Sequence, residues 1–231
     1  MFWYYDPTYI LIIVGMLLSL LASAKVKSSY AKYSQVRCKG GYTGAEAAER
    51  ILKDAGIYDV QIEPVSGKLT DHYDPKNKVL RLSDNVYSAS SVAAIGVAAH
   101  ECGHAIQHSK GYAPLAIRSA IVPAANLGAT ISWPLILVGF FITGSGSILV
   151  QLGILLFSLA VLFQLVTLPV EFNASGRALR ILGENGILYE DEIGGARSVL
   201  RAAALTYVAA AAASILQLLR LVMLFGGRDR D

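Results

Sequence analysis

The sequence predicts a mainly α integral membrane protein with three or four transmembrane helices and one small α+β domain. Composition supports this prediction, since 54% of the 231 residues are hydrophobic, 16% are charged and the mean hydropathy is +0.49. Soluble globular chains carry about 25% charged residues. The charges are also unevenly spread, because residues 119–170 include no Lys, Arg, Asp or Glu.

Charge and cysteine content exclude other classes of protein. The net charge is +3, and the 17 acidic residues are interleaved with the 20 basic ones, so no basic stripe indicates binding to nucleic acid. Two cysteines, Cys38 and Cys102, are too few for the disulfide framework of a small secreted protein. We therefore expect a reducing, cytosol-facing environment and no nucleic-acid partner.

Residues 1–24 are predicted to form an N-terminal transmembrane helix. Tyr9–Ala24 carries no charge, and the aromatic residues 2–5 bring this segment near the ~20 residues that a bilayer helix needs. A cleaved signal peptide is the alternative. It requires a basic residue ahead of the apolar run, whereas Asp6 is the only charged residue before Tyr9.

A transmembrane hairpin is predicted at 119–170. Its two uncharged runs, Ser119–Ile142 and Ile148–Val170, are joined by the small polar turn 143–147. The C-terminal region 202–231 is predicted to be a helix followed by a tail. Its apolar run contains Gln217 and Arg220, so a fourth span and a helix packed against the rest of the protein both stay open.

Basic residues at the span ends predict the orientation, because Lys and Arg close to a span are retained on the cytoplasmic side. Such residues follow the first span, precede the second and follow the third. We therefore expect a multi-pass protein of the cell membrane whose polar segments 25–118 and 171–201 face the cytosol. If 202–225 also spans the membrane, Arg220, Arg228 and Arg230 would lie on the side opposite the cytosol. This is mildly unfavourable and counts against a fourth span. The residues that set the orientation are Lys25, Lys27, Lys32, Arg37, Lys39, Lys110, Arg118, Arg177, Arg180, Arg197 and Arg201.

The polar segment 25–118 predicts a small α+β domain. A capping box at 43–46 precedes apolar residues at helical spacing, which end at Gly56. Short alternating runs at 60–62, 68–70 and 79–83 predict a small sheet with a turn at 74–77. Hydroxyl side chains at 88–91 then offer an N-cap for an apolar helix from about 92 to 107.

That helix carries the motif His-Glu-x-x-His, with His100, Glu101 and His104. Four residues make about one helical turn, so the two imidazoles project from one face about 6 Å apart and can bind one Zn2+. Glu101 flanks this face, where its carboxylate can reach a metal-bound water as general base. A chance pair of histidines is disfavoured, since burying these groups in an apolar helix is costly without a metal or partners.

A catalytic zinc site needs a third protein ligand. His108 lies about 12 Å along the helix axis from His100, too far to share one ion. Glu171, at the end of an uncharged run, can be an interface carboxylate, a partner of Arg177 or the third ligand. Cys102 is turned by about 200° from His100 and is expected to be a buried small side chain.

The sequence resembles the YugP-like family of bacterial membrane zinc metallopeptidases, which are distantly similar to HtpX-type proteases. The resemblance covers nearly the whole chain and implies a gluzincin-like domain with Glu171 as the third ligand. At the position four residues after that ligand, the HtpX-type pattern has an aspartate and this chain has Ser175. Another carboxylate or a weaker hydroxyl must then orient the imidazoles. The motifs that carry the resemblance are 43–46, 69–75, 79–83, 98–107 and 168–175.

We expect a zinc metallopeptidase with one Zn2+ per chain, held by His100, His104 and Glu171, and with Glu101 as the catalytic general base. Its function would be hydrolysis of peptide bonds in a peptide or membrane-protein substrate. The lipid bilayer is its other expected partner, and the position of the ligands near span ends predicts cleavage at the membrane interface. The alternative is a non-catalytic zinc-stabilised membrane scaffold, for which Glu101 would have no use. The sequence indicates neither the substrate nor the oligomeric state.

Two further expectations concern the substrate. An extended peptide could pair with Val79–Ser83 as an edge strand, although an ordinary sheet strand explains this segment equally well. His72, Tyr73 and Tyr189 are candidates for stabilising the oxyanion, each with a structural role as the simpler interpretation.

Overall fold

A computed structural model describes residues 6–143 and 147–226 of the chain. These residues form two compact units. The first, here the membrane unit, comprises residues up to 22, 117–168 and 206 onward; the second, here the polar unit, comprises 23–116 and 169–205. The aromatic residues 2–5, the centre of the predicted turn at 144–146 and the tail with Arg228 and Arg230 lie outside the described residues.

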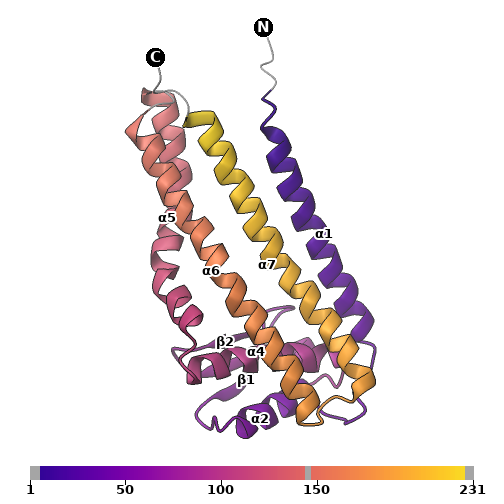
Figure 1. Cartoon of the computed structure of the whole chain (residues 1–231). Coiled ribbons are helices and arrows are strands. Elements are labelled where there is room, and N and C mark those ends of the chain that lie inside the picture. The colour runs from indigo at the N-terminus through magenta and orange to yellow at the C-terminus, as the bar shows by residue number, and fades with distance from the viewer. Residues whose placement is uncertain (1–5, 144–146, 227–231) are drawn as a thin grey trace. The chain divides into compact units, whose positions relative to one another are not determined.

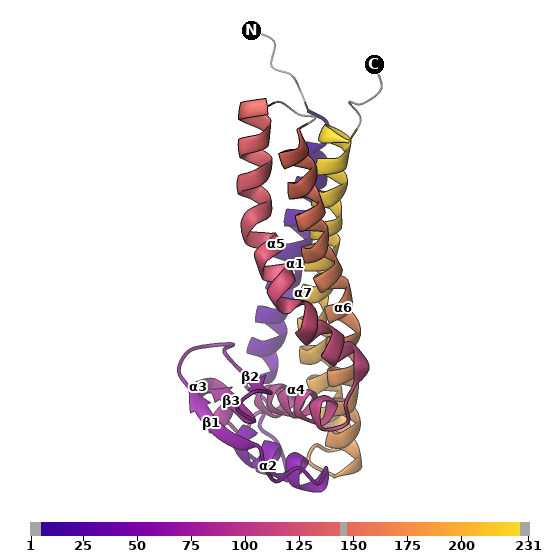
Figure 2. The ribbon, with the colours of Figure 1, turned by 90° about the vertical axis from the view of Figure 1, so that its left-hand side faces the viewer.

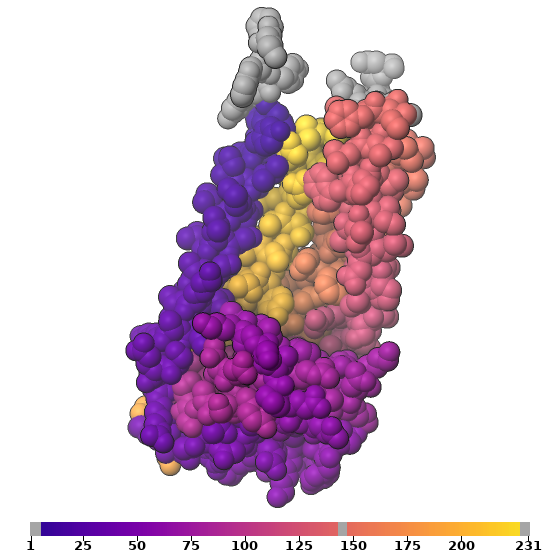
Figure 3. Space-filling view, turned by 180° about the vertical axis from the view of Figure 1, so that it is seen from behind, coloured from indigo at the N-terminus to yellow at the C-terminus, as the bar shows by residue number. Residues whose placement is uncertain are grey.

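The membrane unit consists of segments of four long helices, parts of which also belong to the polar unit. These helices are α1 (Tyr9–Tyr33), α5 (Ala113–Thr143), α6 (Ile148–Glu184) and α7 (Glu190–Phe225). Each is long and apolar enough to cross a membrane. Their membrane-unit segments lie side by side (Figures 1 and 2), and Figure 3 shows α7 between α1 and α5 on one face. The predicted mainly α membrane protein with a small α+β part is thus confirmed, with four candidate spans.

Arg220 has an acidic partner within the membrane unit, which weakens the objection to a fourth span. Its guanidinium donates to a carboxylate oxygen of Asp6 at 2.9 Å and lies over the ring of Tyr9, 4.6 Å from the centroid. Both contacts are with the first residues of the chain that the structure describes. A charge within an apolar helix is less costly when it is paired in this way.

The polar unit contains a three-stranded sheet of order β1-β3-β2. β1 (Gln61–Val65) pairs with β3 (Val79–Ser83) in parallel, and β2 (His72–Asp74) pairs with β3 antiparallel. The predicted turn between β2 and β3 is confirmed, since an Asp74 carboxylate oxygen accepts from the backbone N–H groups of Lys76 and Asn77.

One prediction about this sheet is wrong. Residues 68–70 form no strand, and Leu69 and the preceding Gly67 have φ values of +58° and +115°, outside the range of β-structure. The third strand is instead β2, which lies between the predicted strand and the turn. Of the two interpretations of Val79–Ser83, the structure agrees with the ordinary sheet strand, because this strand is central and paired on both sides and has no free edge for a peptide.

The helices of the polar unit follow the predicted capping signals. α2 (Gly44–Asp54) begins with a capping box between Thr43 and Glu46, and Gly56 follows it with φ +71°. After the short α3 (Asp84–Tyr87), α4 (Val92–Ser109) begins at Ser91, whose hydroxyl accepts from the N–H of Ala94. Serine or threonine at these positions satisfies N–H groups that have no partner in the first turn of a helix.

Helix α4 lies at the centre of the polar unit and is buried along most of its length. Apolar side chains from α2, the sheet, α6 and α7 pack against it and exclude water from its surroundings. This core holds the histidine-bearing helix in a fixed position. Its largest fully buried members are Ile51, Leu80, Leu82, Ile95, Leu182, Ile187 and Leu188.

Candidate metal centre

Helix α4 presents its two motif histidines on one face. The imidazole centroids of His100 and His104 are 4.8 Å apart and the rings meet edge to face at 87°. Their side chains are only 13% and 12% exposed. The one-turn spacing therefore places both rings side by side, as the sequence predicts.

Glu171 on α6 completes the group. Its Oε2 lies 3.2 Å from Nε2 of His100 and 3.6 Å from Nε2 of His104, and its side chain is 3% exposed. One ligand atom from each of the three residues lies within 4.8 Å of the other two. Glu171 faces the imidazoles instead of the membrane interface, while Arg177 donates to the side-chain oxygen of Asn173. Helix α6 continues through residue 170, so the predicted boundary there is not a helix end.

The donor set and its spacing fit Zn2+. Two imidazoles and one carboxylate are the protein ligands of one common type of catalytic zinc site. Donors about 2.1 Å from a tetrahedral zinc lie about 3.4 Å from each other. The separations of Glu171 Oε2 from the two imidazole Nε2 atoms, 3.2 and 3.6 Å, fall on either side of this value, and the ligand atoms of the three residues all lie within 4.8 Å of one another. The donor set and these separations are compatible with one zinc ion.

Each imidazole uses its other nitrogen for a polar contact. Nδ1 of His100 lies 3.1 Å from the Ser175 hydroxyl, and Nδ1 of His104 lies 3.0 Å from the Gln107 side-chain oxygen. When Nε2 binds a metal, Nδ1 carries the proton and donates to these oxygens. In place of an aspartate, either another carboxylate or a hydroxyl was expected to orient the imidazoles. The structure places the Ser175 hydroxyl at Nδ1 of His100 and the Gln107 amide oxygen at Nδ1 of His104.

Gln107 was not singled out from the sequence. It is fully buried, and its side-chain N–H groups donate to the carbonyl of Val170 at 2.8 Å and to Asn173 at 3.0 Å. Gln107 thus joins His104 on α4 to the residue that precedes Glu171 on α6. A signal was present, since an amide three residues after His104 lies on the same face of the helix.

Glu101 lies beside this group with no partner of its own. The residue is 8% exposed, and its carboxylate makes no hydrogen bond or ion pair with any residue in the described ranges. Its carboxylate oxygens are not among the fully buried atoms that lack a hydrogen bond, so they can contact a water molecule beside the candidate metal ligands.

The electrostatic surroundings of His104 favour a positive charge. Burial by itself lowers the pKa of this imidazole, but the hydrogen bond to Glu171 and the charges of Glu101 and Glu171 together outweigh burial, so its pKa is raised. The neighbouring carboxylates therefore favour a cation at this place, which can be a proton on His104 or a metal ion bound by neutral imidazoles.

Gly103 allows α4 and α6 to approach closely enough for these contacts. A Cβ atom at residue 103 would lie 2.7 Å from the carbonyl oxygen of Ala174 and 3.1 Å from its Cα. Backbone atoms cannot move out of the way as a flexible side chain can. Glycine is therefore required here by the distance between the two helices.

The remaining candidate residues lie outside the three-residue group. His108 is exposed, and its Nδ1 bonds to the hydroxyl of Tyr73 at 2.9 Å, which agrees with its exclusion as a ligand. Cys102 is fully buried and its thiol lies 3.7 Å from the carbonyl of Ala48, as expected for a core side chain. His72 contacts the carbonyl of Thr70 at 2.8 Å, and Tyr189 is 56% exposed.

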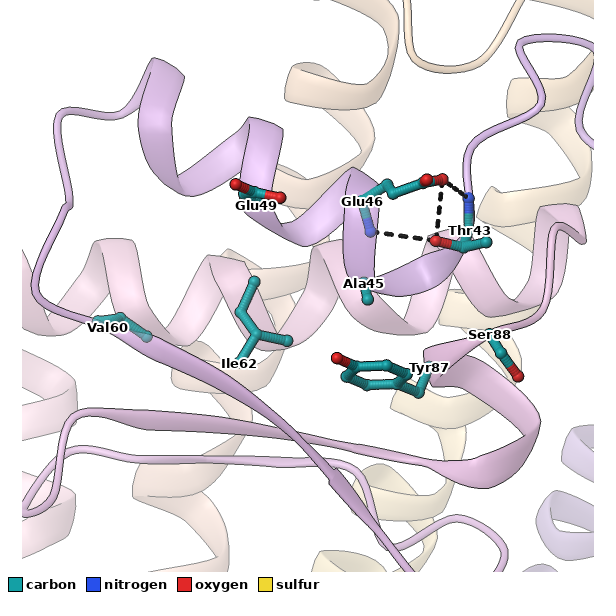
Figure 4. A pocket seen from close by; sticks show the side chains of 8 residues that line it. All are labelled: Thr43, Ala45, Glu46, Glu49, Val60, Ile62, Tyr87 and Ser88. Atoms are coloured by element: carbon teal, nitrogen blue, oxygen red, sulfur yellow. Dashed lines mark hydrogen bonds between the residues drawn. The ribbon is translucent and has the colours of Figure 1, made fainter.

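A separate groove of about 570 Å³ lies between α2, β1 and α3. Figure 4 shows Ile62 from β1 and Tyr87 from α3 at this groove, with the capping box of Thr43 and Glu46 beside it. None of the three candidate metal ligands lines it. The groove therefore belongs to a different part of the polar unit surface.

Comparison with known proteins agrees with this geometry. Residues 8–226 match the family described as "Putative neutral zinc metallopeptidase". The chain belongs to this family. It is also 52% identical over 222 residues to the "Putative membrane protease YugP" of Bacillus subtilis (strain 168). The aligned residues make up 96% of this chain and 98% of that relative. No solved structure matches the chain. The predicted resemblance to a family of membrane zinc metallopeptidases is thus confirmed.

Replacing Gly103 by alanine should separate the metal ligands of the metallopeptidase. Alanine favours a helix by about 1 kcal/mol over glycine, but overpacking against the α6 backbone costs about 1–3 kcal/mol. We expect Gly103→Ala to lower the melting temperature and to weaken zinc binding at least about tenfold. Zinc affinity can be measured on the purified full chain by competition with a chromogenic chelator.

Gly176→Ala is the matched control for this variant. Gly176 lies within α6, and a Cβ atom there would meet no atom within 4 Å. We expect this change to leave zinc affinity unaltered and the melting temperature equal or higher. Equal zinc affinity in parent and Gly103→Ala would show that the close helix contact is not needed for the site.

Removing the Gln107 amide should weaken zinc binding through His104. Loss of a group that orients a metal-binding histidine typically costs 10–100-fold in affinity, so we expect Gln107→Leu to bind zinc about 10–100-fold more weakly. Asn173→Ala serves as control, because it removes one bond of Gln107 and spares the contact with His104. The same loss in both variants, measured by chelator competition, would contradict the specific role of the His104 contact.

Proposed function

We propose that this protein is a zinc-dependent membrane endopeptidase, with one Zn2+ held by His100, His104 and Glu171 and with Glu101 as general base. The convergence of two imidazoles and a carboxylate from two helices, at separations that fit zinc, supports this proposal most directly. Membership of a zinc metallopeptidase family agrees with it. Both imidazoles are also held by a second polar contact, as metal-binding histidines usually are.

The residues around the centre have separable tasks. A zinc ion bound there would polarise a peptide carbonyl and lower the pKa of a coordinated water toward about 7. Ser175 and Gln107 fix the proton on Nδ1 of each imidazole, so that Nε2 is free to bind the metal. The apolar core around α4 excludes bulk water, which strengthens the electrostatic interactions at the site.

Glu101 would move the proton during hydrolysis. Its carboxylate makes no hydrogen bond or ion pair among residues 6–143 and 147–226, and its oxygens are not fully buried, so it is free to accept a proton from the attacking water. The same carboxyl group would then donate that proton to the leaving amine of the cleaved peptide. This return of the proton restores the ionised carboxylate.

The alternative is a metal site that only stabilises the membrane protein. A structural zinc site usually has four protein ligands, whereas a catalytic site has three and one open position. Within the described ranges, no fourth His, Cys, Asp or Glu belongs to the group of His100, His104 and Glu171. Three ligands beside an unpartnered carboxylate favour catalysis.

The substrate is proposed to be a protein or peptide at the membrane, since the Bacillus subtilis relative is named a membrane protease. A peptide added to the sheet as an extra strand would pair with β1 or β2, which are the edge strands. β2 is joined to α4 by the bond between Tyr73 and His108, one turn beyond His104. This places one edge strand against the helix that carries the metal ligands.

Replacing Glu101 by glutamine should abolish most hydrolysis and leave the metal in place. General acid–base catalysis contributes about 10²–10⁴-fold to the rate, so we expect Glu101→Gln to cleave dye-labelled casein slower by about that factor. Glu190→Gln makes the same chemical change at an exposed position on α7 and should cleave at the parent rate. Zinc content, measured by atomic emission, should be one per chain in all three proteins.

Two outcomes would contradict this assignment. Cleavage by Glu101→Gln at the parent rate, with zinc bound, would show that Glu101 is not the base. A zinc-loaded parent that cleaves no casein, and whose cells retain the same full-length proteins as cells with Glu101→Gln, would favour the scaffold.

We also propose that the polar unit faces the cytosol, because the basic residues that flank the spans belong to it or adjoin it. Introduced cysteines can test this, since the native Cys38 and Cys102 are 2% and 0% exposed and burial raises the pKa of the Cys102 thiol. Tyr58 in the polar unit is 79% exposed, and Ser147 lies at the predicted hairpin turn.

A membrane-impermeant maleimide should label Ser147→Cys in intact cells. It should label Tyr58→Cys only after the membrane is opened, because the polar unit is then reached from the cytosolic side. The parent provides the background from the two native thiols. Labelling of Tyr58→Cys but not Ser147→Cys in intact cells would reverse the proposed orientation.

A further inference from the structure

A second concavity of the polar unit lies between the C-terminal part of α1 and the N-terminal part of α7. Its volume is about 370 Å³, and all of its lining residues belong to the polar unit. It shares no residue with the candidate metal centre or with the groove of Figure 4. We call it the α1–α7 groove. It is lined by Lys25, Ser28, Ser29, Lys32, Tyr33, Ser198, Arg201, Ala202 and Leu205.

Each helix contributes one continuous stripe to this groove. On α1 the stripe begins at Lys25 and ends at Lys32, with the two serines one turn from each. On α7 it runs from Ser198 through Arg201 to Leu205. Positions i, i+3, i+4 and i+7 lie on one face of a helix, so each stripe occupies one face of its helix, and both stripes line the groove.

The groove carries three positive charges without acidic neighbours. No Asp or Glu lines it, and none of Lys25, Lys32 and Arg201 forms an ion pair with any carboxylate in the part of the chain that the structure describes. Elsewhere in the polar unit, exposed cations such as Lys39 and Lys78 do pair with aspartates. Three cations around one concavity repel each other unless an anion lies between them.

Ser29 adds a hydroxyl donor. The residue is 7% exposed and lines the groove, and its hydroxyl makes no hydrogen bond within the described ranges. Its oxygen is not among the fully buried atoms that lack a hydrogen bond, so it is accessible from the groove. A ligand with oxygen acceptors in the groove would satisfy this hydroxyl and the three cations together.

The two ends of the groove differ in polarity. Lys25 is the first charge after the uncharged run of α1, and Arg201 is the last charge before the uncharged run of α7. On α7, Ala202 and Leu205 follow Arg201 and are the first groove residues of the uncharged run. They form the apolar end of the groove, which adjoins the uncharged runs of α1 and α7. Tyr33 and the α7 residue Gly195 pack closely at the other end, where a Cβ atom on residue 195 would lie 2.8 Å from the Tyr33 ring.

From these observations, we propose that the α1–α7 groove binds the headgroup of an anionic phospholipid. The phosphate oxygens would accept from Lys25, Lys32, Arg201 and Ser29, while Ala202 and Leu205 would contact the glycerol and the start of the acyl chains. Basic pockets between membrane helices at the cytoplasmic side are known to hold acidic lipid headgroups. A free phosphate ion would use the same cations but would gain nothing from the apolar end.

Native mass spectrometry of the purified full chain in detergent can test this site. The chain is titrated with palmitoyl-oleoyl phosphatidylglycerol and, separately, with phosphatidylcholine that has the same acyl chains. We expect tighter binding of the first phosphatidylglycerol molecule, and a roughly tenfold or greater loss of this affinity in Lys25→Gln/Arg201→Gln. The measurement does not depend on peptidase activity, so its result tests lipid binding independently of the proposed function.

Lys27→Gln/Arg197→Gln is the matched control. It removes two charges from the same two helices, at exposed positions that do not line the groove. We expect its phosphatidylglycerol affinity to stay within about twofold of the parent value. An equal loss in both double variants, or equal affinity for the two lipids, would overturn the proposal.

Two further arms distinguish lipid binding from binding of free phosphate and from a loss of folding. Inorganic phosphate at 10 mM should not displace phosphatidylglycerol; displacement would mean that the groove takes the free ion. If Lys25→Gln/Arg201→Gln melts at a lower temperature, Ser29→Ala tests the site with no change of charge. It should weaken phosphatidylglycerol binding several-fold, and unchanged affinity in this variant would count against the proposal.

Discussion

The close packing of α4 against α6 determines the geometry of the candidate metal centre. At Gly103 the two helices approach so closely that no Cβ atom fits beside the backbone of Ala174. Glu171 lies one turn before this contact and Ser175 directly follows it, so both face α4. One contact between helices therefore places a metal ligand beside the Nε2 atoms and a hydroxyl beside Nδ1 of His100.

Gln107 strengthens the same contact through hydrogen bonds. The buried side-chain amide of Gln107 on α4 donates to the carbonyl of Val170 on α6 at 2.8 Å. A buried amide that spans both helices resists their separation, because each of its polar atoms would lose a partner. The close packing at Gly103 and the hydrogen bonds of Gln107 thus favour the same arrangement of α4 and α6.

Local features of the sequence predicted most of the local structure. The helix caps and the one-turn spacing of His100 and His104 depend on neighbours within four residues, and the structure agrees with them. The central position of β3 and the strand at 72–74 depend on pairing between segments, which short patterns do not encode. For the same reason, residues alone left three roles open for Glu171, and family resemblance was needed to choose one.

The electrostatic surroundings of His104 agree with a cation at this place. Glu101 and Glu171 are both buried residues, and the hydrogen bond and charge of Glu171, together with the charge of Glu101, raise the pKa of the His104 imidazole. Metal binding requires neutral imidazoles, so a bound divalent ion would take the place of the proton that these carboxylates favour. Glu101 is not one of the three ligands that the geometry brings together, and the proposed role as general base gives it a task that metal binding alone does not.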